Sequence, residues 1–290
     1  MLNKTLKTLS FNSKKSLIVL LSLILILAPI SLGAQCKVVN EAFKAGEKVE
    51  YELFFNWKFI WLKAGTAWLT TIDTTFATEP AYQIDLLAVT NQKLDRIFKM
   101  RDTITSVISK QLEPIYYRKG AEEAKNYSVD EAWFWRENST SRVSQKRLRG
   151  NGEIVETSQC DNRCIFDMLS ILAQARSYHP EDFTLGQHIQ FPMATGRKVE
   201  EQTLIYRGKE NVKAEDETGT TYRCLVFSLV EYVKDKKGRE KESEVVTFFV
   251  SDDKNHLPIR LDLYMNIGSA KAFLRNVSGN RYPLECIVKK

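Results

Sequence analysis

The chain has 290 residues with 42 basic and 36 acidic side chains, a formal net charge of +6. Residues 1–34 contribute four lysines and no acid, so the rest of the chain carries only +2. This balance argues against the persistent basic face of a nucleic-acid-binding domain. Apolar residues make up 43% of the sequence, which is ordinary for a globular protein with a sizeable core.

Residues 1–34 have the order of a secretory signal peptide. Lysines come first, residues 17–30 are almost wholly apolar, and small residues lead to Ala34, after which we expect cleavage. The apolar run is shorter than the roughly 20 residues of a membrane span, so we expect no transmembrane helix after cleavage; an uncleaved anchor is the alternative. Gln35 before Cys36 argues against a lipoprotein. The expected location is the periplasm or the outer envelope.

The segment 46–159 has a β pattern. Leu53, Phe55, Trp57, Phe59 and Trp61 occupy alternate positions, so a single strand would place all five side chains on one face. A turn is expected at 63–65 and another at 150–152, with strands at 66–75, 82–90 and 101–109, from Pro114 through Tyr117, and around Trp133 and Trp135.

A helix is predicted over about residues 163–178. Ile165, Met168, Leu169 and Leu172 are spaced three and four apart, which gives one apolar stripe. Asp161 or Asn162 is a suitable cap for its start, and Pro180 ends it. We expect Ile165, Leu169 and Leu172 to pack on the β core, and Arg163 and Gln174 to face water.

The β pattern resumes after this helix, with strands expected at 187–193, 203–207, 222–233, 244–251, 259–267 and 270–277. The predicted fold is mainly β: a large antiparallel curved sheet or open barrel-like fold with one central helix. Residues 35–290 would form a single β-rich domain.

Five cysteines invite a disulfide framework in an exported chain. Cys160 and Cys164, four residues apart at the start of the expected helix, would lie within disulfide reach. Cys36 and Cys286 lie near opposite ends of the domain, and domain termini often meet. We therefore expect Cys160–Cys164 and Cys36–Cys286 pairs, with Cys224 a buried free thiol.

Metal and redox sites are not predicted. The only histidines are His179, His188 and His256, and their spacing from the cysteines matches no familiar zinc site. The Cys160/Cys164 pair has three intervening residues, whereas a thioredoxin-like centre has two. No cofactor and no metal is expected.

The aromatic strands offer a candidate ligand surface for sugar rings or acyl chains: Phe55, Trp57, Trp61, Trp133 and Trp135. The alternative is that these side chains only fill the half-buried face of a sheet. The basic run Arg142, Lys146, Arg147 and Arg149 could meet phosphate groups or anionic glycans, or could simply form a solvated hairpin.

Catalytic motifs are absent from the sequence, and no catalytic residue is assigned. Asp102 with Asp252 or Asp253 is a conceivable carboxylate pair for hydrolysis. The segment 252–255 lacks the central glycine and the closing glutamate of a calcium loop, so it is predicted to be a turn.

A repeat is visible within the sequence. Phe43-x-x-Gly46 followed by an alternating strand recurs as Phe183-x-x-Gly186, and Pro114 and Pro258 follow the two glycines at similar intervals. Similar landmarks at similar spacing indicate two related halves, about 40–159 and 180–288, joined by the helix. The alternative is that many β-hairpins begin in this way.

Several short motifs together resemble the exported bacterial family of domain of unknown function 3108, over about residues 40–285. They are residues 43–51, 64–67, Arg101-Asp102, 112–114, 166–170, 257–259 and 267–268. The Cys160/Cys164 flank and the aromatic richness are similar to Bacteroidetes members. The resemblance implies export and a mostly β fold, and it carries no catalytic residue.

The leading functional hypothesis is an exported envelope protein that binds an amphiphile, a glycan or an envelope protein partner without catalysis. One alternative is a hydrolase of envelope polymers that uses Asp102 with a second acid. Another is a structural scaffold of an envelope assembly, which predicts an exposed apolar patch.

Overall fold

The computed structural model describes residues 36–57, 60–95, 99–123, 126–215, 219–234, 238–265 and 268–288. The expected signal segment 1–34 lies outside these residues, as does Phe59. The strands are β1 (Lys48–Trp57), β2 (Ile60–Phe76), β3 (Glu79–Thr90), β4 (Met100–Ser109), β5 (Pro114–Glu123), β6 (Asn126–Glu137), β7 (Thr140–Leu148), β8 (Ile154–Asp161), β9 (His188–Ala194), β10 (Val199–Lys213), β11 (Thr221–Lys234), β12 (Glu240–Ser251), β13 (Pro258–Tyr264) and β14 (Ser269–Ser278). The helices are α2 (Gln92–Asp95), α3 (Met168–Ala175) and the 3₁₀ turn η2 (Pro180–Asp182).

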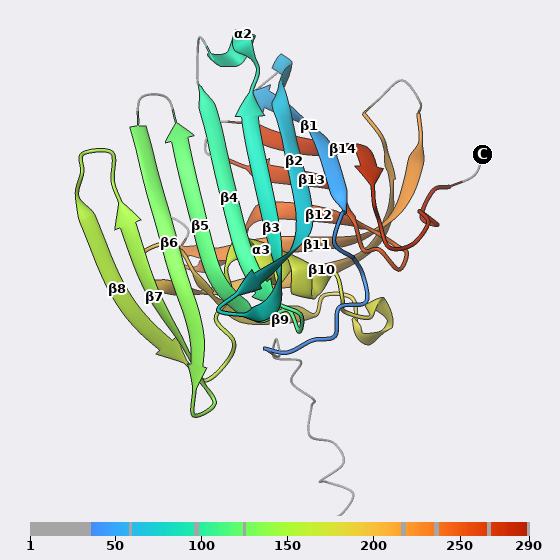
Figure 1. Cartoon of the computed structure of the whole chain (residues 1–290). Coiled ribbons are helices and arrows are strands. Elements are labelled where there is room, and N and C mark those ends of the chain that lie inside the picture. The colour runs from blue at the N-terminus through green and yellow to red at the C-terminus, as the bar shows by residue number, and fades with distance from the viewer. Residues whose placement is uncertain are drawn as a thin grey trace, which may run out of the picture. The chain divides into compact units, whose positions relative to one another are not determined.

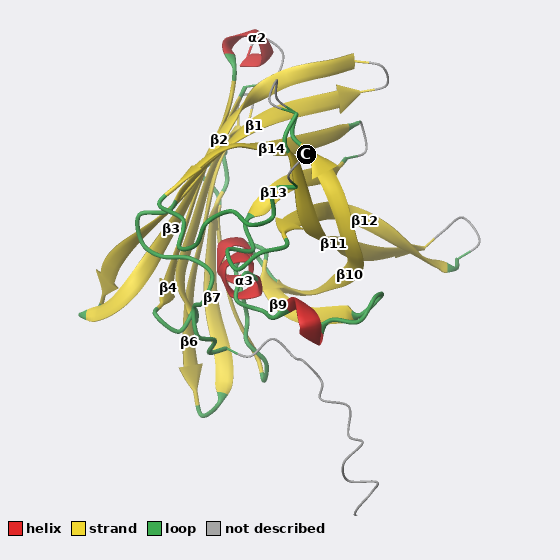
Figure 2. Cartoon of the chain, turned by 90° about the vertical axis from the view of Figure 1, so that its right-hand side faces the viewer, coloured by secondary structure: helices red, strands yellow, loops and turns green. Residues whose placement is uncertain are grey.

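The strands of the described residues form one 14-stranded sheet in the order β8-β7-β6-β5-β4-β3-β2-β1-β14-β13-β12-β11-β10-β9. The pairing is antiparallel throughout. Strands β1–β8 form one wall, and β9–β14 form a second wall that crosses behind it (Figure 1). The sheet is a nearly closed barrel with α3 between the walls (Figure 2), which confirms the predicted fold class.

The core lies on the inner face of this barrel, the face that carries Val49, Leu69 and Ile84 in the first wall. These residues are at most 5% exposed and belong to the same apolar cluster as Leu169 and Ala173 of α3. Alternation along each strand places apolar side chains on this face, so α3 buries its own stripe against both walls.

The helix is shorter than predicted, because α3 begins at Met168 rather than near 163. Its cap is Asp167, whose carboxylate accepts hydrogen bonds from the amides of Leu169 and Ser170, and the Ser170 hydroxyl accepts one from the Asp167 amide. The preceding segment is extended and lies beside β9: the amide of Phe166 donates to the carbonyl of Pro192 in that strand. The expected caps Asp161 and Asn162 are therefore wrong.

The expected burial of the helix is correct with one exception. Ile165 and Leu169 are buried, Leu172 is partly buried, and Arg163 is exposed. Gln174, expected to face water, is fully buried. Its side-chain amide donates to the Cys36 carbonyl at 3.4 Å, and its amide oxygen accepts from the Tyr178 hydroxyl at 2.9 Å, so its burial leaves polar groups satisfied.

The expected turn at 63–65 is also wrong. β1 ends at Trp57 and β2 runs from Ile60 straight through Gly65, with a bulge that leaves Ala64 without a partner in β1. A Cβ on Gly65 would lie 1.9 Å from the Val89 carbonyl oxygen. The glycine therefore permits the close approach of β3 and does not make a turn.

A buried junction ties the first wall, α3 and the β12–β13 turn together. The guanidinium of Arg176 donates to both oxygens of Glu47, at 2.6 and 2.9 Å, and to the carbonyl of Asn255. Both charged side chains are at most 5% exposed. Because a buried charge needs a partner, this pair fixes the end of α3 over the start of β1.

Among the described residues, no helix has the length and hydropathy needed to cross a membrane.

Candidate functional site

A groove of about 750 Å³ lies at one end of the first wall. We call it the rim groove. It is bounded by the connections β2–β3, β4–β5 and β6–β7 and by the segments around Cys36 and Cys164. Its lining residues are Cys36, Lys37, Glu79, Pro80, Ser109, Lys110, Gln111, Glu113, Pro114, Ile115, Phe134, Trp135, Arg136, Ser141, Arg142, Cys164 and Ile165. A volume of this size is typical of small-molecule sites.

A disulfide between Cys36 and Cys164 forms part of the groove. Both expected pairings, Cys160–Cys164 and Cys36–Cys286, are therefore corrected. Cys160 lies on edge strand β8, and the turn after that strand separates it from Cys164, so the two do not share a helical turn. Cys286 is a buried free thiol. Cys224 is the buried free thiol that was predicted.

The N-terminal strap, residues 36–43, closes one side of the groove. The amide of Val38 donates to the Gln111 carbonyl at 2.9 Å, and the Cys36 carbonyl accepts from the buried Gln174. Together with the disulfide, these contacts attach the strap to the β4–β5 turn and to α3. The groove is thus held by covalent and backbone contacts.

The groove combines apolar surface with an excess of positive charge. Ile165 and Phe134 are buried beneath it, and Trp135 is 45% exposed beside it. Four cations and two carboxylates line it: Lys37, Lys110, Arg136, Arg142, Glu79 and Glu113.

Several of these charges are already paired at the groove. Lys37 lies 3.7 Å from Glu113, Arg142 lies 2.8 Å from Glu137, and Lys110 pairs with Asp73, so three of the four cations have a carboxylate partner. Arg136 donates to the Ser139 carbonyl, a neutral group that does not balance its charge. The arrangement suits a ligand with an apolar part and an anionic group.

The candidate aromatic residues do not form one surface. Trp61 lies opposite Asn56 in the β1–β2 pair, so it is on the other face of the sheet from Phe55. The expectation that these two share a face is wrong, because the β1–β2 connection lies between them. Trp61 stacks on Phe54 at 5.2 Å between ring centroids. The side chain of Trp57 is not among the parts of the chain that the structure describes.

Trp133 and Trp135 are exposed on the face of β6 opposite the inner face. Trp133 packs against Tyr116 at 5.6 Å between ring centroids, and the Tyr116 hydroxyl donates to Glu131. Burial and this carboxylate raise the pKa of Tyr116 to about 12. Among the four candidates whose side chains the structure describes, only Trp135 lines the rim groove.

The expected acid pair finds little support. Asp102 lies on β4 with its carboxylate 3.7 Å from Lys119. Asp252 is paired with Lys209 at 3.0 Å, and Asp253 accepts the amides of Glu285 and Cys286 from the C-terminal tail. The segment 252–255 forms a turn, as predicted, and its carboxylates hold neighbouring chain segments.

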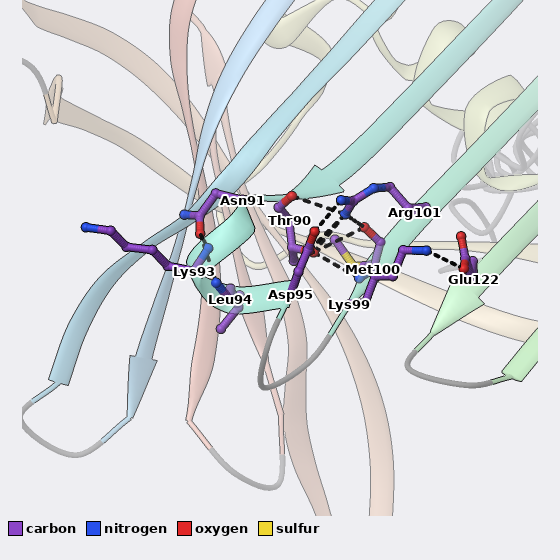
Figure 3. Close-up of polar contacts among 9 residues, drawn as sticks. All are labelled: Thr90, Asn91, Lys93, Leu94, Asp95, Lys99, Met100, Arg101 and Glu122. Carbon is purple, nitrogen blue, oxygen red and sulfur yellow. Dashed lines mark hydrogen bonds and ion pairs between the residues drawn. The ribbon is translucent and has the colours of Figure 1, made fainter.

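Arg101, the neighbour of Asp102 in the family motif, holds the β3–β4 connection (Figure 3). Its guanidinium donates to Asp95 at 3.0 and 2.5 Å and to the Thr90 carbonyl at 3.1 Å. Asn91 caps α2 by accepting the amides of Lys93 and Leu94. The hydrogen bond from Arg101 lowers the pKa of the Asp95 carboxyl. Arg101 therefore has a structural role at the β3–β4 connection.

The described residues hold no cluster of three or more metal-ligating side chains. His188 lies 3.4 Å from the Tyr232 hydroxyl, and His256 bonds the Arg176 carbonyl. The scaffold hypothesis predicted an exposed apolar patch larger than a few hundred Å². Apolar side chains exposed on the outer face of β2 and β3 are Trp68, Ile72, Phe76 and Leu87.

Sequence reasoning missed most of the rim groove. Its lining comes largely from turn residues scattered between 36 and 165, and few of them had been singled out from the sequence: Pro114, Trp135, Arg142, Ile165 and the two cysteines. Turn residues such as Lys110 and Glu113 show no hydrophobic periodicity, so the sequence pattern does not mark them as part of a site. The proline that opens β5 was the sequence feature that could have located this turn.

The comparisons with known proteins agree with this architecture. The profile of a family described as protein of unknown function (DUF3108) matches residues 50–275. No curated protein matches the sequence significantly. A solved β-barrel-like protein of domain of unknown function DUF1849 from Brucella abortus is similar in fold, with a TM-score of 0.52 and 8% identity, over 82% of this chain and 99% of that one. The chain belongs to the DUF3108 family.

Proposed function

We propose that this member of the DUF3108 family is an exported protein that binds an amphiphile with an anionic group in the rim groove, without converting it. The observation that carries the proposal is the groove itself: an apolar floor of Phe134 and Ile165 beside Trp135, with cations at its edge. Burial of an acyl chain on such a floor contributes about 0.8 kcal/mol per methylene group.

Export is supported by two independent features. The lysines and the apolar run at 17–30 have the order of a signal peptide, and a disulfide between Cys36 and Cys164 is typical of proteins outside the cytosol. We place the protein in the periplasm or the outer envelope, where acyl chains with phosphate or carboxylate headgroups are abundant.

The first test is to identify the ligand. Protein exported by a bacterial host is purified without detergent, extracted with organic solvent and examined by mass spectrometry. The proposal expects an acylated anion at a constant ratio to protein. Repeated recovery of protein without such a molecule, together with no binding of added fatty acid or lysophospholipid, contradicts it.

The second test locates the ligand with two tryptophans on the same strand. Trp135→Ala should weaken binding of a fluorescent fatty acid by about tenfold, because its ring lines the groove. Trp133→Ala is the matched control, since Trp133 is similarly exposed but packs on Tyr116 outside the lining. Equal effects of the two changes would move the site away from the rim groove.

A further inference from the structure

A second cavity lies where the β9–β10 hairpin meets strands β5, β6 and β7 of the first wall. We call it the seam pocket. Its volume is about 400 Å³, and Lys119, Ser128, Asp130, Arg147, Arg149 and Arg197 are among its lining residues. They come from β5, β6, β7, the β7–β8 connection and the β9–β10 hairpin, so the pocket joins the two walls.

Cations outnumber carboxylates in the lining of the seam pocket. Four cations line it against one carboxylate, that of Asp130. Arg147 pairs with Asp130 through two hydrogen bonds. Lys119 lies 3.7 Å from Asp102, and Arg149 lies 2.7 Å from Glu153 in an exposed pair; neither carboxylate lines the pocket. Arg197 forms no ion pair with any of the described residues. Cations gathered at one cavity repel one another, and an anion placed among them removes that repulsion.

The pocket is built rigidly at the seam. The amide of Gly196 donates to Gln145 Oε1 at 2.8 Å, and the hydroxyl of Thr157 donates to the carbonyl of Arg197 at 2.9 Å. These bonds dock the β9–β10 hairpin onto β7 and β8. The backbone of the hairpin at Arg197 is therefore held in place before any ligand arrives, which reduces the entropy cost of ordering this segment.

Gly196 shows how tightly this hairpin fits. Its φ is +90°, and a Cβ would lie 2.7 Å from Arg147 Nη2 and 2.8 Å from the Asp130 carboxylate. Asp130 orients Arg147, and Lys119 and Arg149 have carboxylate partners outside the lining, so Arg197 is the cation that a ligand would pair with first, with the other three cations nearby. Guanidinium groups match the oxygen geometry of phosphate.

We propose that the seam pocket binds a phosphate group. Its lining is mostly polar, with the Ser128 hydroxyl beside the cations, so a phosphorylated headgroup fits it and an acyl chain does not. The phosphate could belong to a soluble phosphorylated compound or to a lipid headgroup. The inference does not depend on the rim groove, which has its own lining residues.

The test uses pyrophosphate as the probe, measured by calorimetry at low salt. Arg197→Ala and Arg149→Ala should each weaken binding about tenfold or more, the value of one charge-assisted hydrogen bond. Lys146→Ala is the matched control: Lys146 lies on β7, three residues before Arg149, pairs with Glu156, and is absent from the lining. Trp135→Ala should leave pyrophosphate binding unchanged.

Vesicles of phosphatidylcholine with and without phosphatidic acid distinguish the two sources. Binding to the phosphatidic acid vesicles that pyrophosphate displaces supports a lipid headgroup, and binding of pyrophosphate alone supports a soluble ligand. Absence of pyrophosphate binding at about 10 mM, or an equal loss in Lys146→Ala, overturns the proposal.

Discussion

The turn before β1 and the turn before β9 have the same backbone hydrogen bonds in different surroundings. Gly46 donates to the Thr71 carbonyl and Gly186 to the Tyr206 carbonyl, both at 2.8 Å. The return bonds, from the amides of residues 71 and 206 to the carbonyls of Glu47 and Gln187, are both 3.0 Å. Yet Glu47 is fully buried against Arg176, whereas Gln187 is partly exposed and neutral.

The turns before β5 and β13 repeat this comparison. Ser109 exchanges two hydrogen bonds with Glu113, and Ser251 exchanges the same two with Leu257. A proline follows in each case, and the next residue of each strand, 115 or 259, is bulged. The second turn is two residues longer, and its Asn255 contacts Arg176 and the C-terminal tail. The same backbone turn therefore lines the rim groove before β5 and holds Arg176 and the C-terminal tail before β13.

We propose that strands β1–β6 and β9–β14 are two copies of one meander. The two have the same strand order and direction in the sheet, and the landmarks at 46 and 186 and at 114 and 258 fall on matching hydrogen bonds. Related copies should tolerate exchange of their matching turns. Replacing 109–114 by 251–258 should give a folded protein, measured by circular dichroism and thermal unfolding. An insoluble product would favour independent origins of the two turns.

The largest expected effect comes from breaking the buried Arg176–Glu47 pair, which distinguishes the turn before β1 from the turn before β9. Arg176→Met leaves the Glu47 carboxylate buried without its partner, which should lower the free energy of unfolding by about 3–5 kcal/mol. The double variant with Glu47→Gln makes the first turn resemble the second, with its neutral Gln187, and should recover at least half of the loss. Urea unfolding measures both. A loss below about 1 kcal/mol in the single variant would mean that Glu47 is solvated.

The next effect tests whether the two walls share one core. Leu169 of α3 is 2% exposed and packs in the cluster that both walls supply. Leu169→Ala should cost about 2–5 kcal/mol and should destabilise both walls in a single transition. Met168→Ala, at an exposed neighbouring position, should change stability by less than about 0.5 kcal/mol. Two separate unfolding transitions would show that the walls are independent.

A smaller effect tests whether the turns before β1 and β9 are equally strained. Gly46 and Gly186 have φ values of +91° and +79°, and an added Cβ would meet nothing within 4 Å at either site. Alanine at either site should lower the free energy of unfolding only by the strain of a left-handed backbone, about 1–2 kcal/mol. Gly46→Ala and Gly186→Ala should therefore cost nearly the same in urea unfolding. Unequal costs would show that the surroundings differ in strain as well as in burial.

The sequence predicted those features that depend on local patterns. Alternation predicted the strands, and the landmark glycines and prolines fell on matching turns. The start of α3 was missed because the apolar segment 164–166 fits a strand as well as a helix. The Cys36–Cys164 pair joins segments 128 residues apart, and the rim groove gathers turns from across the first wall. Such contacts depend on the assembled sheet, which local spacing does not encode.

The smallest expected effect is a pH dependence present in only one of the matching turns. The residue with positive φ before each proline is Leu112 in the first turn and His256 in the second. His256 bonds the Arg176 carbonyl at 2.6 Å, and burial lowers its pKa below the usual value. The hydrogen bond to the Arg176 carbonyl and the nearby carboxylates of Asp253 and Asp252 oppose this lowering of the pKa, while the positive charge of Arg176 adds to it.

A lowered pKa means that the unfolded chain binds the His256 proton more readily than the folded protein does. Stability should therefore fall as pH drops through the unfolded value of about 6.5, with a slope of at most about 1.4 kcal/mol per pH unit for one proton. His256→Asn keeps a residue that tolerates positive φ and should remove this part of the slope between about pH 7 and 5. Urea unfolding at several pH values compares the two proteins. Identical slopes would mean that the folded and unfolded states bind this proton equally well, and the two turns would then differ in burial alone.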